Sequence, residues 1–350
     1  MSLDSSFLHR AGCWFLASGI VEPSGGVARY RHIEQKRNLP VSTEITGYAV
    51  STFSYLYRRT GEQKYLDASV HCAQFLTRQA WNPDLQTFPF ETAPGSPAYF
   101  FDCGIIVRGI LSVYRLTHDR EILNIAQQAG RTMARDFLTP AAIHPVIALP
   151  SREPLPYEKR WSREPGCFLL KSAMAWKNLG MELYWRTALK QALTNDPPFL
   201  PGAAEPEKIM DRLHAYCYYL EGLLAEPGCP ECAAALRIGI PRTAGYLHEI
   251  APQFARSDVY AQLLRIRFYA DAFGIQPMDR VAAEQEAAAI ASFQYTTNNS
   301  ALNGGFCFGR RAGHFLPFVN PVSSAFSLQA LDLWSQYCDG KFKPDLDALI

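Results

Sequence analysis

The chain is 350 residues long, of which 48% are hydrophobic and 19% charged, so it can bury a large core and is not intrinsically disordered. Its formal net charge of +1 gives no general attraction to nucleic acid or to an anionic membrane surface. No apolar run approaches the roughly 20 residues that span a bilayer. We therefore expect neither nucleic acid nor a membrane as a partner, and the composition leaves the oligomeric state open.

The hydrophobic pattern is helical from one end of the chain to the other. It predicts twelve helices within one domain of residues 1–350. Two short segments, 86–90 and 305–308, are candidates for extended pieces that can pair. The predicted helices span residues 3–19, 43–59, 62–79, 99–116, 119–137, 167–178, 181–194, 209–224, 229–247, 257–273, 279–293 and 321–338.

The links between these helices alternate in length. Tight turns such as Thr60-Gly61 separate the two helices of a hairpin, and glycine there allows the left-handed backbone that ends a helix. Longer links, rich in glycine, proline and aromatic residues, lead into the first helix of the next hairpin. Long loops on a regular scaffold usually carry binding and chemistry. The longer links are residues 20–42, 80–98, 138–166, 195–208 and 294–320.

A sequence repeat supports the hairpin interpretation. Residues 44–70 align with residues 101–127 at one constant offset, which places Gly47 on Gly104 and Tyr57 on Tyr114. A fixed period of this size indicates an array of one supersecondary unit. If such an array closes into a ring, it makes a pocket at its centre, with the long links gathered on one face.

Two motifs resemble those of a known superfamily. They are TEITGYAVSTFSYLYRRTGEQKYLDAS, which begins at Thr43, and NGGF…NPVSSAFSLQALDLW, which begins at Asn303. Together with the alternating links, they resemble carbohydrate-active members of the six-hairpin (α/α)6 toroid superfamily. These include unsaturated glucuronyl hydrolases, sugar 2-epimerases, and the helical domains of uronate epimerases and polysaccharide lyases. The resemblance implies an all-α (α/α)6 toroid that acts on a saccharide.

Two carboxylates are the first catalytic candidates. Glu44 and Asp102 stand in the first turns of two predicted helices that begin after long links. Glycoside cleavage uses a pair of carboxyl groups, one as acid and the other as base or nucleophile. The resemblance to the glucuronyl hydrolases highlights Asp102, which stands in a similar D-x-G-I context. Helix capping alone also favours acidic residues at such positions.

Further candidates open two later helices. His214 and Tyr216 lie near the start of the helix predicted over 209–224, where either side chain can serve as acid or base. Asp258 begins the helix predicted over 257–273, where Ser257 is the expected cap. The same helix carries Tyr260, Gln262 and Arg265, and Arg265 can clamp a sugar carboxylate with its planar guanidinium.

Three long links share turn residues, an aromatic residue and a polar or charged end, which is the composition of a saccharide-binding loop. They are residues 24–32, 86–91 and 298–311, and packing of the loops on one another is the alternative explanation. Arginines at 29, 31, 160, 163, 310 and 311 also fall in long links and favour an anionic sugar. The predicted substrate-binding residues are Tyr30, Arg31, Tyr48, Phe88, Phe90, Tyr260, Arg265, Asn303, Phe306, Phe308 and Arg310.

The nine cysteines are scattered, and several occupy apolar positions of helical patterns. This usage suits a reducing compartment better than a disulfide framework. Because the N-terminal stretch also lacks the pattern of a secretion leader, we expect a cytoplasmic protein. Cys229 and Cys232 form a lone CxxC pair, which has no second pair with which to hold zinc. We expect no metal site and no cofactor.

Taken together, these features predict an enzyme that cleaves a glycosidic bond in an oligo- or polysaccharide, with uronic acid as a candidate component. The chemistry is carboxylate acid/base catalysis by a hydrolase or a lyase. The first alternative is a sugar or uronate epimerase. The second is a non-catalytic glycan-binding or assembly protein in polysaccharide biosynthesis.

Overall fold

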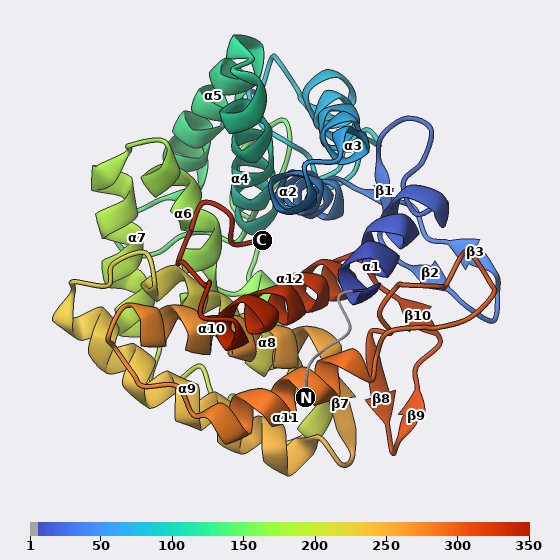
Figure 1. Ribbon diagram of the computed structural model, residues 1–350. Helices are drawn as coiled ribbons and strands as arrows, with labels where there is room; N and C mark the ends of the chain where they lie inside the picture. The colour runs from blue at the N-terminus through green and yellow to red at the C-terminus, as the bar shows by residue number, and fades with distance from the viewer. Residues whose placement is uncertain (1–5) are drawn as a thin grey trace. The chain divides into compact units, whose positions relative to one another are not determined.

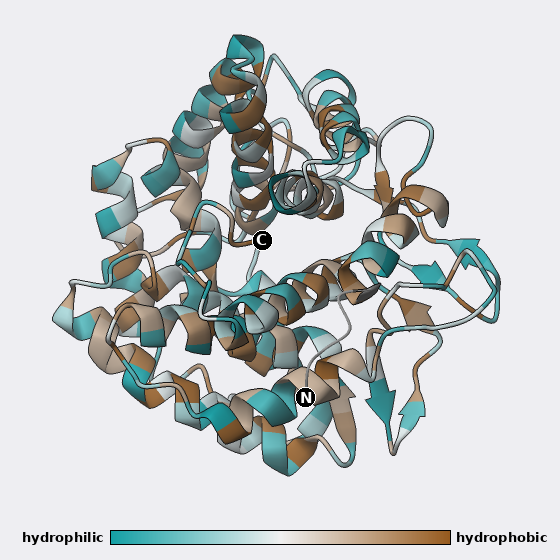
Figure 2. Ribbon diagram, viewed as in Figure 1, coloured by the Kyte–Doolittle hydropathy of each residue, from teal (hydrophilic) through white to brown (hydrophobic). Residues whose placement is uncertain are grey.

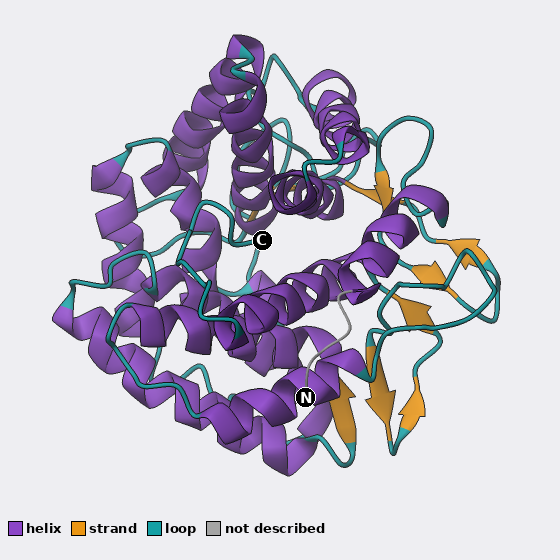
Figure 3. Cartoon of the chain, viewed as in Figure 1, coloured by secondary structure: helices purple, strands orange, loops and turns teal. Residues whose placement is uncertain are grey.

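The computed structural model describes residues 6–350, which fold mainly into helices joined by loops and short strands (Figures 1 and 3). Their contacts group the chain into two compact units. Unit 1 comprises residues 6–20, 30–39 and 197–349, and unit 2 comprises residues 21–29, 40–196 and 350. The prediction of a single domain over residues 1–350 stays a prediction.

Unit 2 contains three helical hairpins. The first helices of the three hairpins, α2, α4 and α6, pack side by side in that order, and α3, α5 and α7 each cover their own hairpin partner. Two short antiparallel strand pairs, β1 with β4 and β5 with β6, precede or flank the hairpins. The helices are α2 (Thr43–Thr60), α3 (Gln63–Phe75), α4 (Phe100–Thr117), α5 (Arg120–Phe137), α6 (Leu170–Asn178) and α7 (Glu182–Asn195), and the strands are β1 (Val27–Ala28), β4 (Val41–Ser42), β5 (Ala98–Tyr99) and β6 (Val146–Ile147).

Local sequence explains where α2 begins and ends. The side chain of Ser42 accepts a hydrogen bond from the backbone N–H of Ile45, which caps the helix. Gly61 adopts φ 71° and ends the helix in the left-handed conformation, as the Thr60-Gly61 turn predicted. Helix α4 ends at His118 in the same conformation, although this residue has a side chain.

The repeated glycines mark the places where consecutive helices of unit 2 approach closely. A Cβ atom added to Gly47 of α2 would lie 3.0 Å from the Cα of Ile106 in α4. A Cβ atom added to Gly104 of α4 would lie 2.4 Å from the backbone oxygen of Ser172 in α6. Gly47 and Gly104 therefore have the same structural role in successive hairpins, because each allows the backbone of the next helix to approach closely.

Unit 1 also contains three pairs of helices. Helices α8, α10 and α12 pack on one another in that order, while α9 and α11 cover α8 and α10, and α1 packs on α12. Two three-stranded antiparallel sheets complete the unit, β10-β2-β3 and β7-β8-β9. The helices are α1 (Ser6–Ala17), α8 (Pro206–Leu223), α9 (Pro230–Ile250), α10 (Ser257–Ala272), α11 (Arg280–Ala291) and α12 (Pro321–Cys338), and the strands are β2 (Arg31–His32), β3 (Arg37–Asn38), β7 (Phe254–Arg256), β8 (Gly309–Arg311), β9 (His314–Phe315) and β10 (Phe318–Val319).

Within each unit, the helices that pack on one another in a row are more fully buried than the helices that cover them. Helices α4, α10 and α12 are buried on nearly every side over most of their length, whereas α5 and α11 bury one face. The hydropathy colouring shows hydrophilic and hydrophobic stretches alternating along α5, as expected of a helix with one solvent-facing side (Figure 2). None of the helices among residues 6–350 combines the length and apolar character needed to cross a bilayer.

The predicted helices agree with the observed ones to within about three residues in nearly all cases, apart from the part of the first that lies outside the described residues. Segments 86–90 and 305–308 do contain extended residues that pair. Each makes a bridge within its own unit, Thr87 with Asn82 and Phe306 with Gln294. The sequence analysis overlooked most of the short strands, because two or three residues are too few to show an alternating pattern.

Candidate active site

Glu44 and Asp102 form an electrostatically linked pair in unit 2, which we call the carboxyl pair. They lie in the first turns of the adjacent helices α2 and α4. Burial raises the pKa of Glu44 to about 7, against an opposing effect from the charge of Arg29. Burial and then the negative charge of Glu44 raise the pKa of Asp102 well above its usual range. Asp102 is 5% exposed, and its Oδ2 has no hydrogen-bond partner within residues 6–350.

Two aromatic rings, with an arginine at each end, form a column next to this pair. The guanidinium of Arg29 lies 4.9 Å from the ring centroid of Phe90, whose ring is 5.1 Å from that of Tyr99. The guanidinium of Arg163 lies 5.1 Å from the Tyr99 ring on β5. We call these four residues the arginine–aromatic column.

The column is electrostatically connected to the carboxyl pair through Arg29 at one end and through Tyr99 in its interior. Arg29 acts on the pKa values of Glu44 and Asp102, as described above. The pKa of Tyr99 is raised first by burial and also by the charge of Asp102. Aromatic faces suit the C–H patches of a sugar ring, and guanidinium groups suit its hydroxyl or carboxylate oxygens. Two carboxyl groups with raised pKa values therefore lie next to side chains that suit a saccharide.

His214 lies at the centre of a polar cluster in unit 1, which we call the histidine cluster. Its Nδ1 is 2.7 Å from Oε1 of Gln262 and 3.6 Å from Oδ2 of Asp258. Arg256 donates two hydrogen bonds to Asp258, of 3.0 and 2.7 Å, and a third of 2.7 Å to Asp211. The helices α8 and α10 and the strand β7 together supply these residues.

The cluster fixes the protonation of its histidine. The Gln262 amide donates from its nitrogen to the backbone oxygen of His214, so its oxygen accepts from Nδ1–H. Burial, followed by the charge of Arg256, lowers the pKa of His214 to about 4. The imidazole is therefore neutral at physiological pH, with its proton on Nδ1 and a lone pair on Nε2. Burial alone would raise the pKa of Asp258, but the charge of Arg256, its hydrogen bonds and the other groups around the carboxylate together hold this pKa below its usual value.

The structure places the side chain of Tyr216 apart from that of His214. Tyr216 is fully buried, and its hydroxyl oxygen would lie 3.2 Å from a Cβ atom added to Gly239 in α9. Residues two apart point to different sides of a helix, whereas residues four apart share one. The ring centroid of Tyr218 accordingly lies 4.6 Å from that of His214. Both residues also lie well inside α8 rather than at its start, because this helix begins at Pro206.

The cap expected for α10 was wrong. The N-cap residue is Arg256, and Ser257 is the first residue of the helix. The Ser257 hydroxyl instead donates 2.7 Å to the backbone oxygen of Cys307.

Several predicted substrate-binding residues lie in the interior of their units. Arg265 is fully buried, donates to Glu221 and Gln329, and stacks 4.0 Å from the centroid of Phe326. This guanidinium is therefore committed to interior partners. Tyr48, Phe88 and Phe306 are likewise buried in the core.

The remaining predicted binding residues lie closer to the surface. Phe308 joins the histidine cluster, because the guanidinium of Arg256 lies 4.6 Å from its ring centroid. Arg310 lies between the rings of Phe293 and Phe315, at 4.5 and 4.6 Å. Four others occupy loops or helix faces of unit 1. The rings of Tyr30 and Tyr260 contact those of Phe318 and Phe293. Arg31 donates to Asn38, and Asn303 accepts from the Thr297 backbone.

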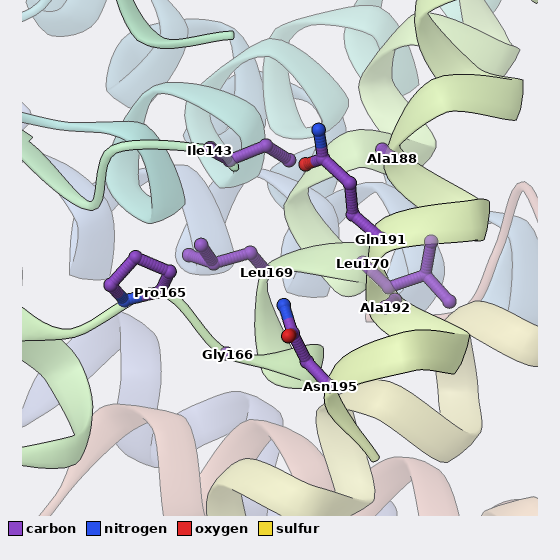
Figure 4. A pocket seen from close by; sticks show the side chains of 9 residues that line it. All are labelled: Ile143, Pro165, Gly166, Leu169, Leu170, Ala188, Gln191, Ala192 and Asn195. Carbon is purple, nitrogen blue, oxygen red and sulfur yellow. The ribbon is translucent and has the colours of Figure 1, made fainter. Parts of the chain in front are cut away.

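Two cavities lie apart from the carboxyl pair and the histidine cluster. A small one in unit 2, of about 10 Å³, is lined by Leu169, Gln191 and Asn195 among others, and is too small for a sugar (Figure 4). A larger one in unit 1, of about 360 Å³, lies over α10 and is lined by Tyr260 and by the buried ion pair of Arg267 with Glu286. Across residues 6–350, no group of three or more His, Cys, Asp and Glu side chains is arranged to hold a metal ion.

No family model and no curated protein matches this sequence. Solved structures do. A cellobiose 2-epimerase from Spirochaeta thermophila has a TM-score of 0.70 at 12% identity, over 94% of this chain and 95% of that one. A sugar epimerase from a ruminal bacterium has a TM-score of 0.69 at 12% identity, over 93% and 97%. An unsaturated glucuronyl hydrolase from Streptococcus agalactiae has a TM-score of 0.68 at 10% identity, over 99% and 95%.

The chain has the (α/α)6 toroid fold. At these identities the similarity shows the fold alone, as fold does not determine function. The fold class named from the sequence is thus confirmed, and so is the resemblance to structures of this superfamily. The roles of individual site residues stay predictions.

Sequence reasoning missed parts of both regions. Tyr99 and Arg256 each end a very short strand and precede a helix, where nothing in the local pattern distinguishes them. Tyr218 carried a usable signal, namely its spacing of four residues from His214. Arg29 and Arg163 were noted only as members of a group of loop arginines, and the structure separates them from the others by placing them in the arginine–aromatic column.

Proposed function

We propose that the protein is a carbohydrate-active enzyme that hydrolyses a glycosidic bond in an oligo- or polysaccharide, with the carboxyl pair as its catalytic groups. The observation that carries this proposal is the state of Asp102. Its carboxyl group is buried, has a pKa raised well above the usual range, and has one oxygen without a hydrogen-bond partner in the described chain. A protonated, unsatisfied carboxyl group is suited to donate its proton to a ligand.

The two carboxyl groups then take different roles. Asp102, whose pKa is raised by burial and by the charge of Glu44, donates its proton to the leaving glycosidic oxygen as the C–O bond breaks. Glu44, whose pKa is about 7, is ionised in part of the population and acts as the base or nucleophile at the anomeric carbon. Water supplies the hydroxyl group of the released sugar, and its proton restores the acid.

The arginine–aromatic column supports a saccharide as substrate. The rings of Phe90 and Tyr99 offer an apolar face, and Arg29 and Arg163 at its two ends offer donors to hydroxyl or carboxylate oxygens. A uronic acid would satisfy a guanidinium at either end. Saccharide-active enzymes of similar fold, such as the unsaturated glucuronyl hydrolase, are consistent with this substrate class.

The test is hydrolysis of a panel of neutral and uronic-acid oligosaccharides by the wild-type protein and by Asp102→Asn and Glu44→Gln. We expect a loss of about 10²–10⁴-fold in kcat for Asp102→Asn, the usual contribution of a general acid. Glu121→Gln is the matched control, because Glu121 stands in the first turn of α5 but is exposed. Saccharide binding by both variants without any wild-type cleavage would instead support a non-catalytic glycan-binding protein.

The histidine cluster favours a second candidate function, epimerisation of a sugar. His214 is neutral with a lone pair on Nε2, which is the form needed to remove a proton from a sugar carbon. Two proteins of similar fold are sugar epimerases. In this case His214→Gln abolishes the exchange of a sugar C–H proton with deuterated water, which NMR measures, while Asp102→Asn retains it. Hydrolysis without exchange eliminates this candidate.

A further inference from the structure

The CxxC pair of unit 1 lies at the N-terminus of α9, at a place that the proposed function does not use. Cys229 is the N-cap residue of this 21-residue helix, Pro230 is its first residue and Cys232 its third. Side chains at the N-cap and third positions of a helix face each other, as in the capping box. The helix geometry therefore brings the two thiols together.

The two thiols interact with different neighbours. The Cys229 thiol donates to Oε2 of Glu231 at 3.2 Å. Burial, and after it the side chain of Cys229, raises the pKa of Cys232. Cys232 thus stays a thiol next to Cys229, while Glu231 stays an ionised acceptor of the Cys229 hydrogen bond.

The two cysteines differ in access. Cys229 is partly exposed, whereas Cys232 is fully buried. A helix N-terminus stabilises negative charge, and a thiolate is the reactive form of cysteine. An accessible thiol at a helix N-terminus beside a buried partner is the arrangement of an attacking and a resolving cysteine.

We propose that Cys229 and Cys232 form a reversible dithiol–disulfide site that reacts with low-molecular-weight disulfides. Cys229 loses its proton to solvent and its thiolate attacks one sulfur of the disulfide R–S–S–R, which releases R–S⁻ and forms a mixed disulfide. Cys232 then loses its proton to solvent and attacks the Cys229 sulfur, which releases the second R–S⁻. The two cysteines are oxidised by two electrons, and the small disulfide is reduced to two thiols.

The test uses the full-length protein and oxidised glutathione, with the modified residues located by peptide mass spectrometry. In the wild-type protein we expect an internal Cys229–Cys232 disulfide with no lasting glutathione adduct on either residue. In Cys232→Ser we expect a stable glutathione adduct on Cys229, since the resolving thiol is absent. In Cys229→Ser the buried Cys232 stays unmodified.

Two controls make the result specific. Cys338 is exposed and stands at the end of α12, so Cys338→Ser removes another accessible thiol without affecting the pair. Glu231→Gln removes the negative charge beside Cys229, which disfavours the thiolate, and we expect it to speed the adduct formation of Cys232→Ser by about threefold or more. The proposal is overturned if Cys229 in Cys232→Ser reacts no faster than Cys338, or if the wild-type pair stays reduced at every ratio of oxidised to reduced glutathione. Circular dichroism confirms that each variant is folded.

Discussion

The carboxyl pair of unit 2 and the histidine cluster of unit 1 both contain acidic residues at the start of a helix. The pKa values of these acids are shifted in opposite directions. Glu44, Asp102 and Asp258 all stand in the first turn of a helix, where the N-terminal dipole favours an ionised acid. The pKa values of Glu44 and Asp102 are nevertheless raised, while that of Asp258 is lowered.

The difference comes from where the nearest arginine directs its hydrogen bonds. Arg256 makes two hydrogen bonds to Asp258, and both groups are buried. Arg29 instead pairs with Glu91 at 2.7 Å, in a setting where both side chains are about one third exposed, and acts on the carboxyl pair only through its charge. Asp258 is thus held as an anion by the hydrogen bonds of Arg256, whereas Glu44 and Asp102 receive no such hydrogen bonds from Arg29.

The largest expected effect is on stability. Arg256→Met leaves the ionised Asp258 buried without its partner, and we expect a loss of about 3–5 kcal/mol in the free energy of unfolding. Arg29→Met should cost about 1 kcal/mol or less, because Glu44 and Asp102 can keep their protons. Urea unfolding of both variants measures the difference. Equal losses would mean that the two regions do not differ as described, and Arg256→Met combined with Asp258→Asn should recover part of the loss.

The second effect is the pH dependence of stability. The folded-state pKa of Glu44, about 7, exceeds its ordinary value of 4.5, so folding favours the protonated form. Its contribution to stability is complete below about pH 4.5 and is lost as the pH rises to about 7. Glu44→Gln should flatten this part of the curve of unfolding free energy against pH. An unchanged slope in the variant would show that Glu44 is ionised in the folded protein at all these pH values.

The third effect is on the pH profile of catalysis. The charge of Arg29 lowers the pKa values of both Glu44 and Asp102, so Arg29→Met raises both. Activity requires ionised Glu44 and protonated Asp102, so both limbs of the kcat profile should move to higher pH, by about 1 unit. Arg29→Lys keeps the charge and serves as the control. A shift to lower pH would contradict the assignment.

The smallest effect concerns Glu91. Glu91→Gln removes the exposed partner of Arg29, and an exposed pair of this kind contributes up to about 1 kcal/mol. We expect a stability change below that limit. Both limbs of the kcat profile should move slightly to lower pH, since the charge of Arg29 is then no longer offset by Glu91. A change as large as that of Arg256→Met would show that Glu91 belongs to the buried network.

The helices and their order could be predicted from the sequence because each carries a long periodic pattern. The equivalence of Gly47 and Gly104 was visible as a repeat, and the structure supplied its reason, the backbone contact between neighbouring helices. The candidate site was only partly predictable. Glu44 and Asp102 were found from their positions near helix starts, whereas Tyr99 and Arg256 were missed because very short strands leave no pattern.

The sequence by itself determined the helical hairpins, their links and the residue types that stand at each helix start, since these depend on interactions between neighbours along the chain. Only the tertiary structure decided which acids keep their protons, which face of α8 carries His214, and which arginines are committed to interior partners. Burial and the distance to a counter-charge set those properties, and both depend on side chains that are far apart in the sequence, such as Asp211 and Arg256.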